Sequence, residues 1–362
     1  MVKHTYIHIP FCKKICSYCD FCKLFYDKKQ VSLYIKSLKK EINNIYKGEE
    51  QDTIYIGGGT PSSLDLEELK ELFKVLNILK KSKDIEYTIE CNFSTITYEK
   101  LCLFKEYGIN RLSFGIESVN PKNLEILDRQ ENKNTIIKVL DMARNLGFNN
   151  INLDLMYAIP KESISDLEKD IDFILRLNPE HISTYSLIIE EHTKLYLNNT
   201  KKISEDLDLL MYNRICKRLK SNYNHYEISN FAKEGYESKH NTCYWKNKEY
   251  YGFGLGASSY LNDIRYTNTR SITKYLDNEY TYTKEILSKE DKMEYEMILG
   301  LRLLSGVSKE EFYNKYKVYI NEYFDIDKLL DNKLLEESET NYYINEENLY
   351  ISNEILLNFI KE

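Results

Sequence analysis

The first half of the chain alternates short strand-like runs with helix-like runs, and this pattern constrains the fold more than any other feature. Six runs have the length and composition of strands, at residues 4–9, 53–57, 85–90, 111–115, 150–157 and 181–187. Helical patterns lie between them, at residues 31–46, 64–79, 99–107, 132–145 and 165–177. Repeated strand–helix units form parallel sheets with right-handed crossovers. Six units predict an α/β fold, an incomplete (β/α)6 barrel rather than a closed eightfold one.

The pattern changes after residue 221. Residues 226–230 and 250–266 predict strands and loops that close the side of the barrel, with a hairpin turn at Asn262 and Asp263. From residue 284 the pattern is helical, and two β runs follow at 342–344 and 349–351. The sequence therefore predicts a partial barrel over 1–220, a barrel-closing segment over 221–283 and a small winged-helix-like α+β domain over 284–362. That last domain has no basic stripe, which argues against DNA binding.

The composition restricts the class of protein. The chain has 362 residues, 42% of them hydrophobic, enough for a large α/β domain with a small appendage. A net charge of −7 argues against a general nucleic-acid binder. Because there is no apolar run of about 18 residues and no signal-peptide pattern, we expect a cytoplasmic protein, at most peripheral at a membrane. Eight cysteines in such a chain indicate metal or redox chemistry before disulfides.

Three of the cysteines, Cys12, Cys16 and Cys19, follow the first strand in a C-x3-C-x2-C spacing. Three thiolates can hold three irons of a [4Fe–4S] cluster and leave the fourth iron open to a small molecule. A zinc ribbon is the alternative, but it needs a second cysteine pair, and none follows. Cys22 is either a further ligand or a bystander. Tyr18, between Cys16 and Cys19, would shield the cluster from water.

A glycine run, residues 57–62, comes directly after the second predicted strand. Gly58 and Gly59 would let a ligand approach the backbone closely and would expose N–H donors, with Thr60 beside them. The run lacks G-x-G-x-x-G spacing and a Walker lysine, so we expect no dinucleotide or ATP phosphate site. A tight turn between strand and helix is the alternative interpretation.

Charged residues mark the ends of the later strands. Glu90 ends the third strand, and Ser113 and Glu117 lie near the end of the fourth. Arg129 follows on the next helix-like segment and can neutralise a ligand carboxylate bidentately. Asp154 lies inside an apolar strand, where an acid is rarely buried without a partner. Since the carboxyl ends of parallel strands meet at one edge, we expect a shared binding site there. Taken singly, each charge also fits an exposed strand end.

Together these residues resemble the radical S-adenosylmethionine (SAM) superfamily. They most closely resemble its branch that contains oxygen-independent coproporphyrinogen III oxidase (HemN) and the heme chaperone HemW. The resemblance covers nearly the whole chain, through motifs at residues 6–19, 57–62, 111–120, 152–157, 226–232 and 240–245. It implies a radical-SAM barrel in which one electron from the cluster cleaves SAM to methionine and a 5′-deoxyadenosyl radical.

The resemblance also implies roles for individual residues. Cys12, Cys16 and Cys19 would bind the cluster as the metal site. The residues that would bind or border SAM are Tyr6, Tyr18, Gly58, Gly59, Thr60, Glu90, Glu117, Arg129 and Asp154. Glu117 departs from the family, because HemN carries a glutamine at this position. No residue is assigned a catalytic role, since the bound groups do the chemistry.

Two features favour the chaperone within this branch. Only 11 residues precede Cys12, so the long N-terminal arm of the oxidase family is not expected. Residues 240–245 match the H-N-x-x-Y-W motif typical of HemW-like proteins. His240 beside aromatic residues would be a heme-iron ligand. A loop held by a buried tryptophan and a histidine hydrogen bond is the alternative.

We therefore expect a HemW-like chaperone that binds a [4Fe–4S] cluster, SAM and heme and delivers heme to membrane acceptors. The expected partners are heme-acceptor respiratory proteins, an electron donor for the cluster and a second copy of the chain, with no nucleic acid. Three alternatives stay open at this point. They are a coproporphyrinogen III oxidase, a radical SAM enzyme acting on heme, and a cluster-bearing scaffold that does not cleave SAM.

Overall fold

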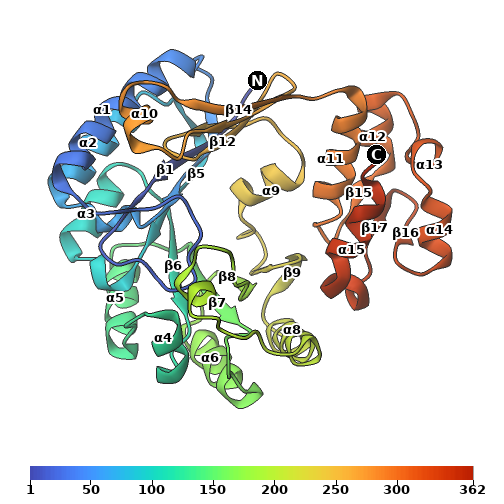
Figure 1. Cartoon of the computed structure of the whole chain (residues 1–362), viewed down its shortest axis with the longest axis horizontal. Coiled ribbons are helices and arrows are strands. Elements are labelled where there is room, and N and C mark those ends of the chain that lie inside the picture. Colours follow the sequence, from blue (N-terminus) through green and yellow to red (C-terminus); the bar gives the residue numbers. More distant parts are fainter. Residues whose placement is uncertain (362) are drawn as a thin grey trace.

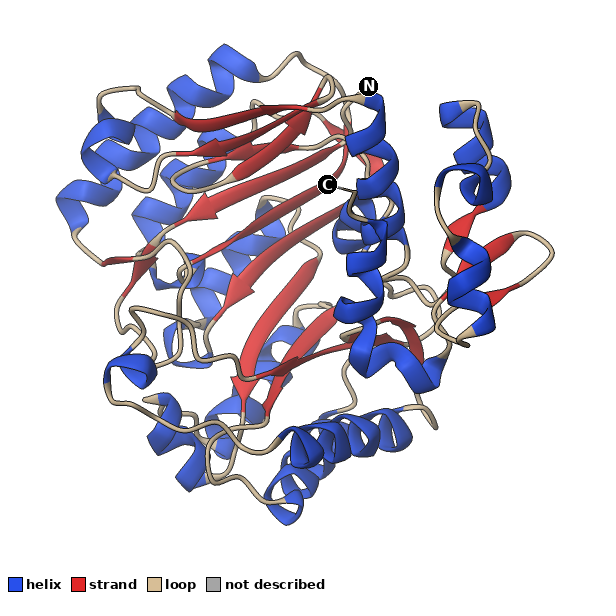
Figure 2. Ribbon diagram, turned by 45° about the vertical axis from the view of Figure 1, so that its right-hand side comes forward, coloured by secondary structure: helices blue, strands red, loops and turns tan. Residues whose placement is uncertain are grey.

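A computed structural model describes residues 1–361 of the chain, and its centre is one curved sheet of nine strands (Figures 1 and 2). Six parallel strands form most of this sheet: β1 (His4–Ile9), β4 (Gln51–Gly58), β5 (Lys81–Cys91), β6 (Arg111–Glu117), β7 (Ile151–Tyr157) and β8 (His181–Ser186). Neighbours in this series pair in parallel. The expected incomplete (β/α)6 barrel is confirmed.

Helices connect these strands and cover the outer side of the sheet (Figure 1). They are α1 (Lys28–Ile45), α2 (Leu66–Leu76), α3 (Tyr98–Glu106), α4 (Pro121–Leu127), α5 (Lys133–Asn145) and α6 (Ile164–Leu177). Successive side chains of a strand point to opposite faces. Leu112 and Phe114 of β6 accordingly join the buried apolar core, whereas Ser113 and Gly115 line a cavity on the inner side. We call this inner, concave side the hollow of the sheet.

Short elements extend the sheet at both edges. After α7 (Lys194–Leu197) and α8 (Glu205–Leu219), strand β10 (Asn230–Ala232) pairs antiparallel with β8, and β9 (Asn224–Glu227) pairs with β10. At the other edge, β11 (Tyr251–Phe253) pairs in parallel with β1. Between the two edges the chain forms helix α9 (Lys239–Trp245), where the sequence pattern predicted only strands and loops.

Two smaller sheets lie near the edge formed by β11 and its neighbour β1. One consists of β12 (Ser258–Leu261), β13 (Ile264–Asn268) and β14 (Thr281–Ile286), with α10 (Ile272–Leu276) between the last two. Its predicted hairpin turn is confirmed, with φ of 50° at Asn262 and 60° at Asp263, as a two-residue turn with two positive φ angles requires. The other sheet pairs β2 (Phe11–Cys12) with β3 (Leu24–Phe25), so the cysteine loop begins and ends at one place.

The C-terminal part mixes helices and strands and lies beside α9 and β9 (Figure 1). Its elements are α11 (Lys289–Gly300), β15 (Val307–Ser308), α12 (Lys309–Tyr316), α13 (Ile320–Tyr323), α14 (Ile326–Asp331), β16 (Glu336–Glu337), β17 (Asn341–Tyr343) and α15 (Ser352–Leu356). Within residues 1–361, no helix is both long and apolar enough to cross a membrane. The division of the chain at residues 220 and 283 stays a prediction.

One strand expected in this part is wrong. Strand β17 matches the expected run at 342–344, but residues 349–351 belong to a 3₁₀ helix, Glu346–Ile351. The side chain of Asn345 accepts a hydrogen bond from the Asn348 N–H at 3.0 Å and so caps this helix. Strand β17 pairs with β15 and β16 instead.

Candidate functional site

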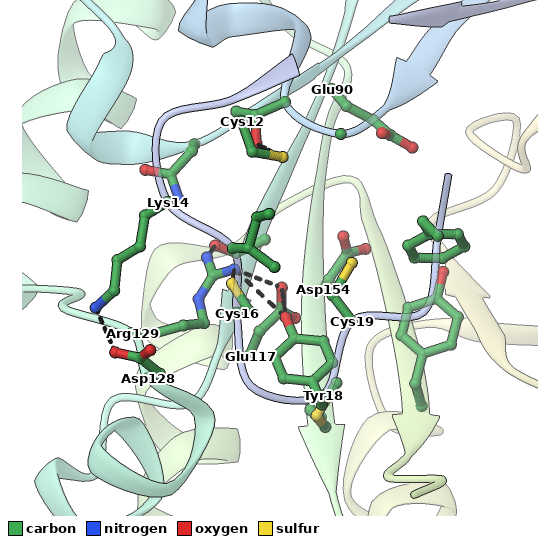
Figure 3. Close-up of a pocket in the computed structure, with 18 of the residues that line it drawn as sticks. Cys12, Lys14, Cys16, Tyr18, Cys19, Glu90, Glu117, Asp128, Arg129 and Asp154 are labelled. Carbon is green, nitrogen blue, oxygen red and sulfur yellow. Dashed lines mark hydrogen bonds and ion pairs between the residues drawn. The ribbon is translucent and has the colours of Figure 1, made fainter. Parts of the chain in front are cut away.

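A cavity of about 520 Å³ lies at the carboxyl ends of the parallel strands (Figure 3). It is lined by most of the predicted site residues: Cys12, Cys16, Tyr18, Cys19, Gly58, Gly59, Thr60, Glu90, Glu117, Arg129 and Asp154. They come from the cysteine loop, from β4 to β7 and from the segment after α4. The strand order brings together residues that are far apart in the sequence, as expected of a parallel sheet.

Backbone contacts position the cysteine loop across the cavity. The N–H of Ser17 donates to the carbonyl of Leu127 at 3.1 Å, and its hydroxyl donates to the carbonyl of Ile126 at 2.7 Å. On the loop itself, the Cys12 thiol lies 3.5 Å from Thr60 Oγ1, and Arg129 Nη1 donates to Cys16 Sγ at 3.8 Å. These contacts hold the Cys12 and Cys16 sulfur atoms at the cavity.

The cysteines and their surroundings fit an iron–sulfur cluster. A Cβ atom on Gly59 would lie 2.9 Å from Cys12 Sγ and 2.6 Å from the carbonyl oxygen of Pro10, so only glycine fits against this ligand. In the part of the chain that the structure describes, no three His, Cys, Asp or Glu side chains lie close enough to hold one metal ion. A cluster instead takes each thiolate on a separate iron, and sulfur is the donor it requires.

Glu90 and the glycine run meet at the end of β4. Glu90 accepts hydrogen bonds from the Gly58 N–H and from the Tyr55 hydroxyl, both at 2.9 Å. A Cβ on Gly57 would lie 2.9 Å from Glu90 Oε1, so a larger residue would displace the Glu90 carboxyl. Burial raises the pKa of Glu90 to about 7. The carboxyl can thus change its charge near neutral pH when a cationic ligand arrives.

Arg129 is held between two carboxylates at the rim of the cavity. Its Nη1 lies 3.2 Å from Glu117 Oε1, its Nη2 lies 2.9 Å from Glu131 Oε1, and Nη2 also donates to the carbonyl of Gly115 at 2.6 Å. The Tyr18 hydroxyl donates to Glu117 at 3.2 Å. Glu117 therefore faces Arg129 and Tyr18 across the site. The sequence reasoning missed Glu131, whose only signal is a charge two residues after Arg129.

The end of strand β6 is irregular at Glu117. The pairing of β6 with β7 shifts register between Gly115 and Glu117, and Glu117 adopts a φ of 61°. A non-glycine residue in this left-handed region stores backbone strain, which is typical of functional sites. Glu117 lines the cavity together with Ser113 and Gly115 of the same strand, as the alternation of side chains along β6 requires.

Asp154 is oriented by a chain of hydrogen bonds through Asn152. Asn152 Nδ2 donates to Asp154 Oδ1 at 2.7 Å and to Ser113 Oγ at 2.9 Å. Asn152 Oδ1 lies 2.6 Å from His181 Nδ1, and His181 Nε2 lies 2.9 Å from the Tyr226 hydroxyl. Burial, and secondarily the charge of Glu117, raise the pKa of Asp154 well above its ordinary value.

Two predicted site residues lie outside the cavity lining. The Tyr6 hydroxyl forms a hydrogen bond with His8 Nδ1 at 2.9 Å. The Tyr6 ring stacks on Tyr55, whose hydroxyl donates to Glu90. His240 is 1% exposed, and both of its ring nitrogens are engaged, Nδ1 with Thr53 Oγ1 and Nε2 with the Tyr244 hydroxyl, each at 2.7 Å. Both ring nitrogens of His240 are thus occupied in this conformation, and its role as a heme ligand stays a prediction.

Comparisons with known proteins agree on the family. The model of the radical SAM superfamily matches residues 6–174, and that of the HemN C-terminal domain matches residues 287–350. "Heme chaperone HemW" of Bacillus subtilis is 39% identical over 379 aligned residues and covers all of both chains. "Heme chaperone HemW" of Lactococcus lactis is 36% identical, over 98% of this chain and 97% of its own.

A solved structure supports the fold. Coproporphyrinogen III oxidase (HemN) from Escherichia coli superposes with a TM-score of 0.88 at 21% identity, over 99% of this chain and 90% of that one. At this identity the likeness concerns the arrangement of the elements, the partial barrel and the C-terminal domain alike.

Proposed function

Because this chain belongs to the HemW family of the radical SAM superfamily, we propose that it is a heme chaperone that holds a [4Fe–4S] cluster and SAM and delivers heme to membrane acceptors. The observation that carries the proposal is the cavity at the strand ends, where three cysteines meet a glycine edge and buried carboxyls. Relatives named heme chaperones, which align over the whole chain, favour this function over porphyrinogen oxidation.

In this proposal the residues of the cavity divide the work of binding. Cys12, Cys16 and Cys19 hold the cluster. Gly58, Gly59 and Thr60 border the methionyl group of SAM, whose amino group Glu90 attracts once it ionises. When bound, the cluster supplies the single electron that cleavage of SAM requires, and a separate protein must donate it.

The remaining charges fix the ligand and keep water away. Arg129 is positioned by Glu117 and Glu131 to meet a carboxylate. Asp154, turned toward the cavity by Asn152, is placed to accept hydroxyl groups of a ribose. The Tyr18 hydroxyl accepts a hydrogen bond from Arg129 Nη1 at 3.5 Å, which holds Tyr18 against the cysteine loop. A cytoplasmic location and a homodimer remain predictions.

We assign the heme site to the H-N-x-x-Y-W segment as a proposal of its own. His240 can ligate iron only by giving up its contact with the Tyr244 hydroxyl, which frees Nε2. Trp245, at the end of the same helix, has a buried Nε1 without a hydrogen-bond partner among residues 1–361, and it would flank the macrocycle.

Titration of anaerobically reconstituted protein with heme tests both proposals. We expect a saturable Soret change, and we expect His240→Ala to shift the Soret maximum and weaken binding about tenfold, as loss of an iron ligand should. His4→Ala is the matched control, because His4 is buried and shares the same Thr53 hydroxyl at 3.0 Å. Absence of any Soret change in the unsubstituted protein would contradict the function, and equal spectra of the two variants would remove His240 as ligand.

A further inference from the structure

Arg111 is a buried cation without a partner among the residues that the structure describes. Its side chain is 2% exposed, and Nε is buried with nothing to bond to. Within residues 1–361 its guanidinium forms neither a hydrogen bond nor an ion pair with another side chain or the backbone. Arginine keeps its charge at any physiological pH. A buried charge without a counter-charge is costly, so the site calls for an anion that the protein does not itself supply.

The guanidinium lies in the hollow of the sheet. Arg111 shares the face of β6 with Ser113, which lines the cavity, while Leu112 between them packs outward into the core. Burial is the main cause of the shifted pKa values of four groups in the hollow, and the charge of Arg111 acts on each as a lesser cause; they are Tyr55, Glu90, His181 and His240. Because Arg111 precedes Ser113 by two residues in β6, it lies about 7 Å farther from the carboxyl end of the strand, and so deeper in the hollow.

The neighbours of Arg111 offer a second hydrogen-bond donor beside the guanidinium but no ion pair with it. Glu90 is already bonded to the Gly58 N–H and the Tyr55 hydroxyl and forms no ion pair with Arg111. Thr88 is the register partner of Arg111 across β5 and β6, and its buried side-chain oxygen has no hydrogen-bond partner within residues 1–361. A guanidinium next to a free hydroxyl offers two kinds of donor to one carboxylate.

The wall above this pair is aromatic. Tyr185 of β8 lines the cavity and remains 44% exposed, although two further strands, β10 and β9, follow β8 in the sheet. A second tyrosine, Tyr226, has its hydroxyl 2.9 Å from His181 Nε2. A ligand that suits the hollow thus combines a flat apolar body with a carboxylate on a short arm.

We propose that Arg111 and Thr88 bind a propionate carboxylate of the tetrapyrrole at the floor of the hollow, with the macrocycle against Tyr185. This inference rests on the proposed function and adds the group that recognises the cargo. It also accounts for the unpaired charge, which the protein keeps in place for a ligand.

Binding of heme and of heme dimethyl ester to reconstituted Arg111→Met protein tests the inference. The ester lacks the carboxylates and is otherwise the same macrocycle. We expect Arg111→Met to weaken heme binding about tenfold or more and to leave ester binding unchanged. Since the substitution removes an unpaired buried charge, we expect the ligand-free variant to unfold at the same or a higher temperature. Arg144→Met, which removes a half-buried cation that is paired with Glu180, is the control and should change neither affinity.

The outcomes distinguish failure of the Arg111 inference from failure of the proposed chaperone function. Equal heme affinity of Arg111→Met and the unsubstituted protein would overturn the inference and leave the chaperone function standing. SAM binding can be followed by the change that SAM makes in the electron paramagnetic resonance spectrum of the reduced cluster. If Arg111→Met weakens the binding of SAM and not of heme, Arg111 recognises SAM and the inference is overturned. No heme binding by the unsubstituted protein would overturn both.

Discussion

Charged residues inside apolar strands mark the hollow of this sheet. Asp154 was predicted to face the site on that signal alone, and the cavity lining agrees. Arg111 carries the same signal but starts its strand, so the sequence gives no means to distinguish it from a charge at a strand end. Glu131 and the role of Asn152 were missed for another reason. Their partners, Arg129 and His181, are brought to them by tertiary contacts.

Glu90 predicts a pH dependence of stability. Its pKa rises from 4.5 to about 7 on folding, so between these values the folded protein keeps a proton that the unfolded chain has lost. The stabilising contribution of this proton is complete below about pH 4.5 and is lost as the pH rises to about 7. Urea unfolding of cluster-free protein should show the unsubstituted chain losing stability relative to Glu90→Gln across this range. Parallel curves for the two proteins would mean that Glu90 ionises normally.

Long elements were predictable and short ones were not. The strand at His4–Ile9 has the expected bounds, and the helix at Lys133–Asn145 starts one residue later than expected. Strands β10 and β11 have three residues each, too few for a periodic signal, and they are defined by the neighbours they pair with. The helix at Lys239–Trp245 depends likewise on contacts of His240 with β4.

The loop after β4 predicts a steric requirement for the cluster. Gly59→Ala would press a methyl group against Cys12 Sγ and the backbone of Pro10, so we expect iron content well below the about four atoms per chain of a full cluster. Gly235→Ala is the control, because its φ of 82° brings backbone strain while no atom lies within 4 Å of the new Cβ. Iron and sulfide analysis after anaerobic reconstitution checks this. Full cluster content in Gly59→Ala would contradict the packing at this ligand.

At the scale of the whole molecule, the C-terminal part is joined to the barrel beside the proposed heme segment. The Ile228 N–H donates to the Arg302 carbonyl, and the Leu304 N–H donates to the Tyr226 carbonyl, each at 3.1 Å. The Arg302 guanidinium lies 4.5 Å from the centre of the Trp245 ring. The sequence predicted both parts but not this junction, since it joins strand edges that carry no pattern of their own.

Transfer of heme tests the central claim most directly. Reconstituted, heme-loaded protein would be mixed with membranes that contain heme-free respiratory acceptors, and the cytochrome spectrum of the membranes would be followed. The account predicts that the membranes gain cytochrome absorbance as the protein loses its Soret band, faster than with free heme at the same concentration. Heme that stays on the protein, or acceptors filled equally fast by free heme, would contradict it.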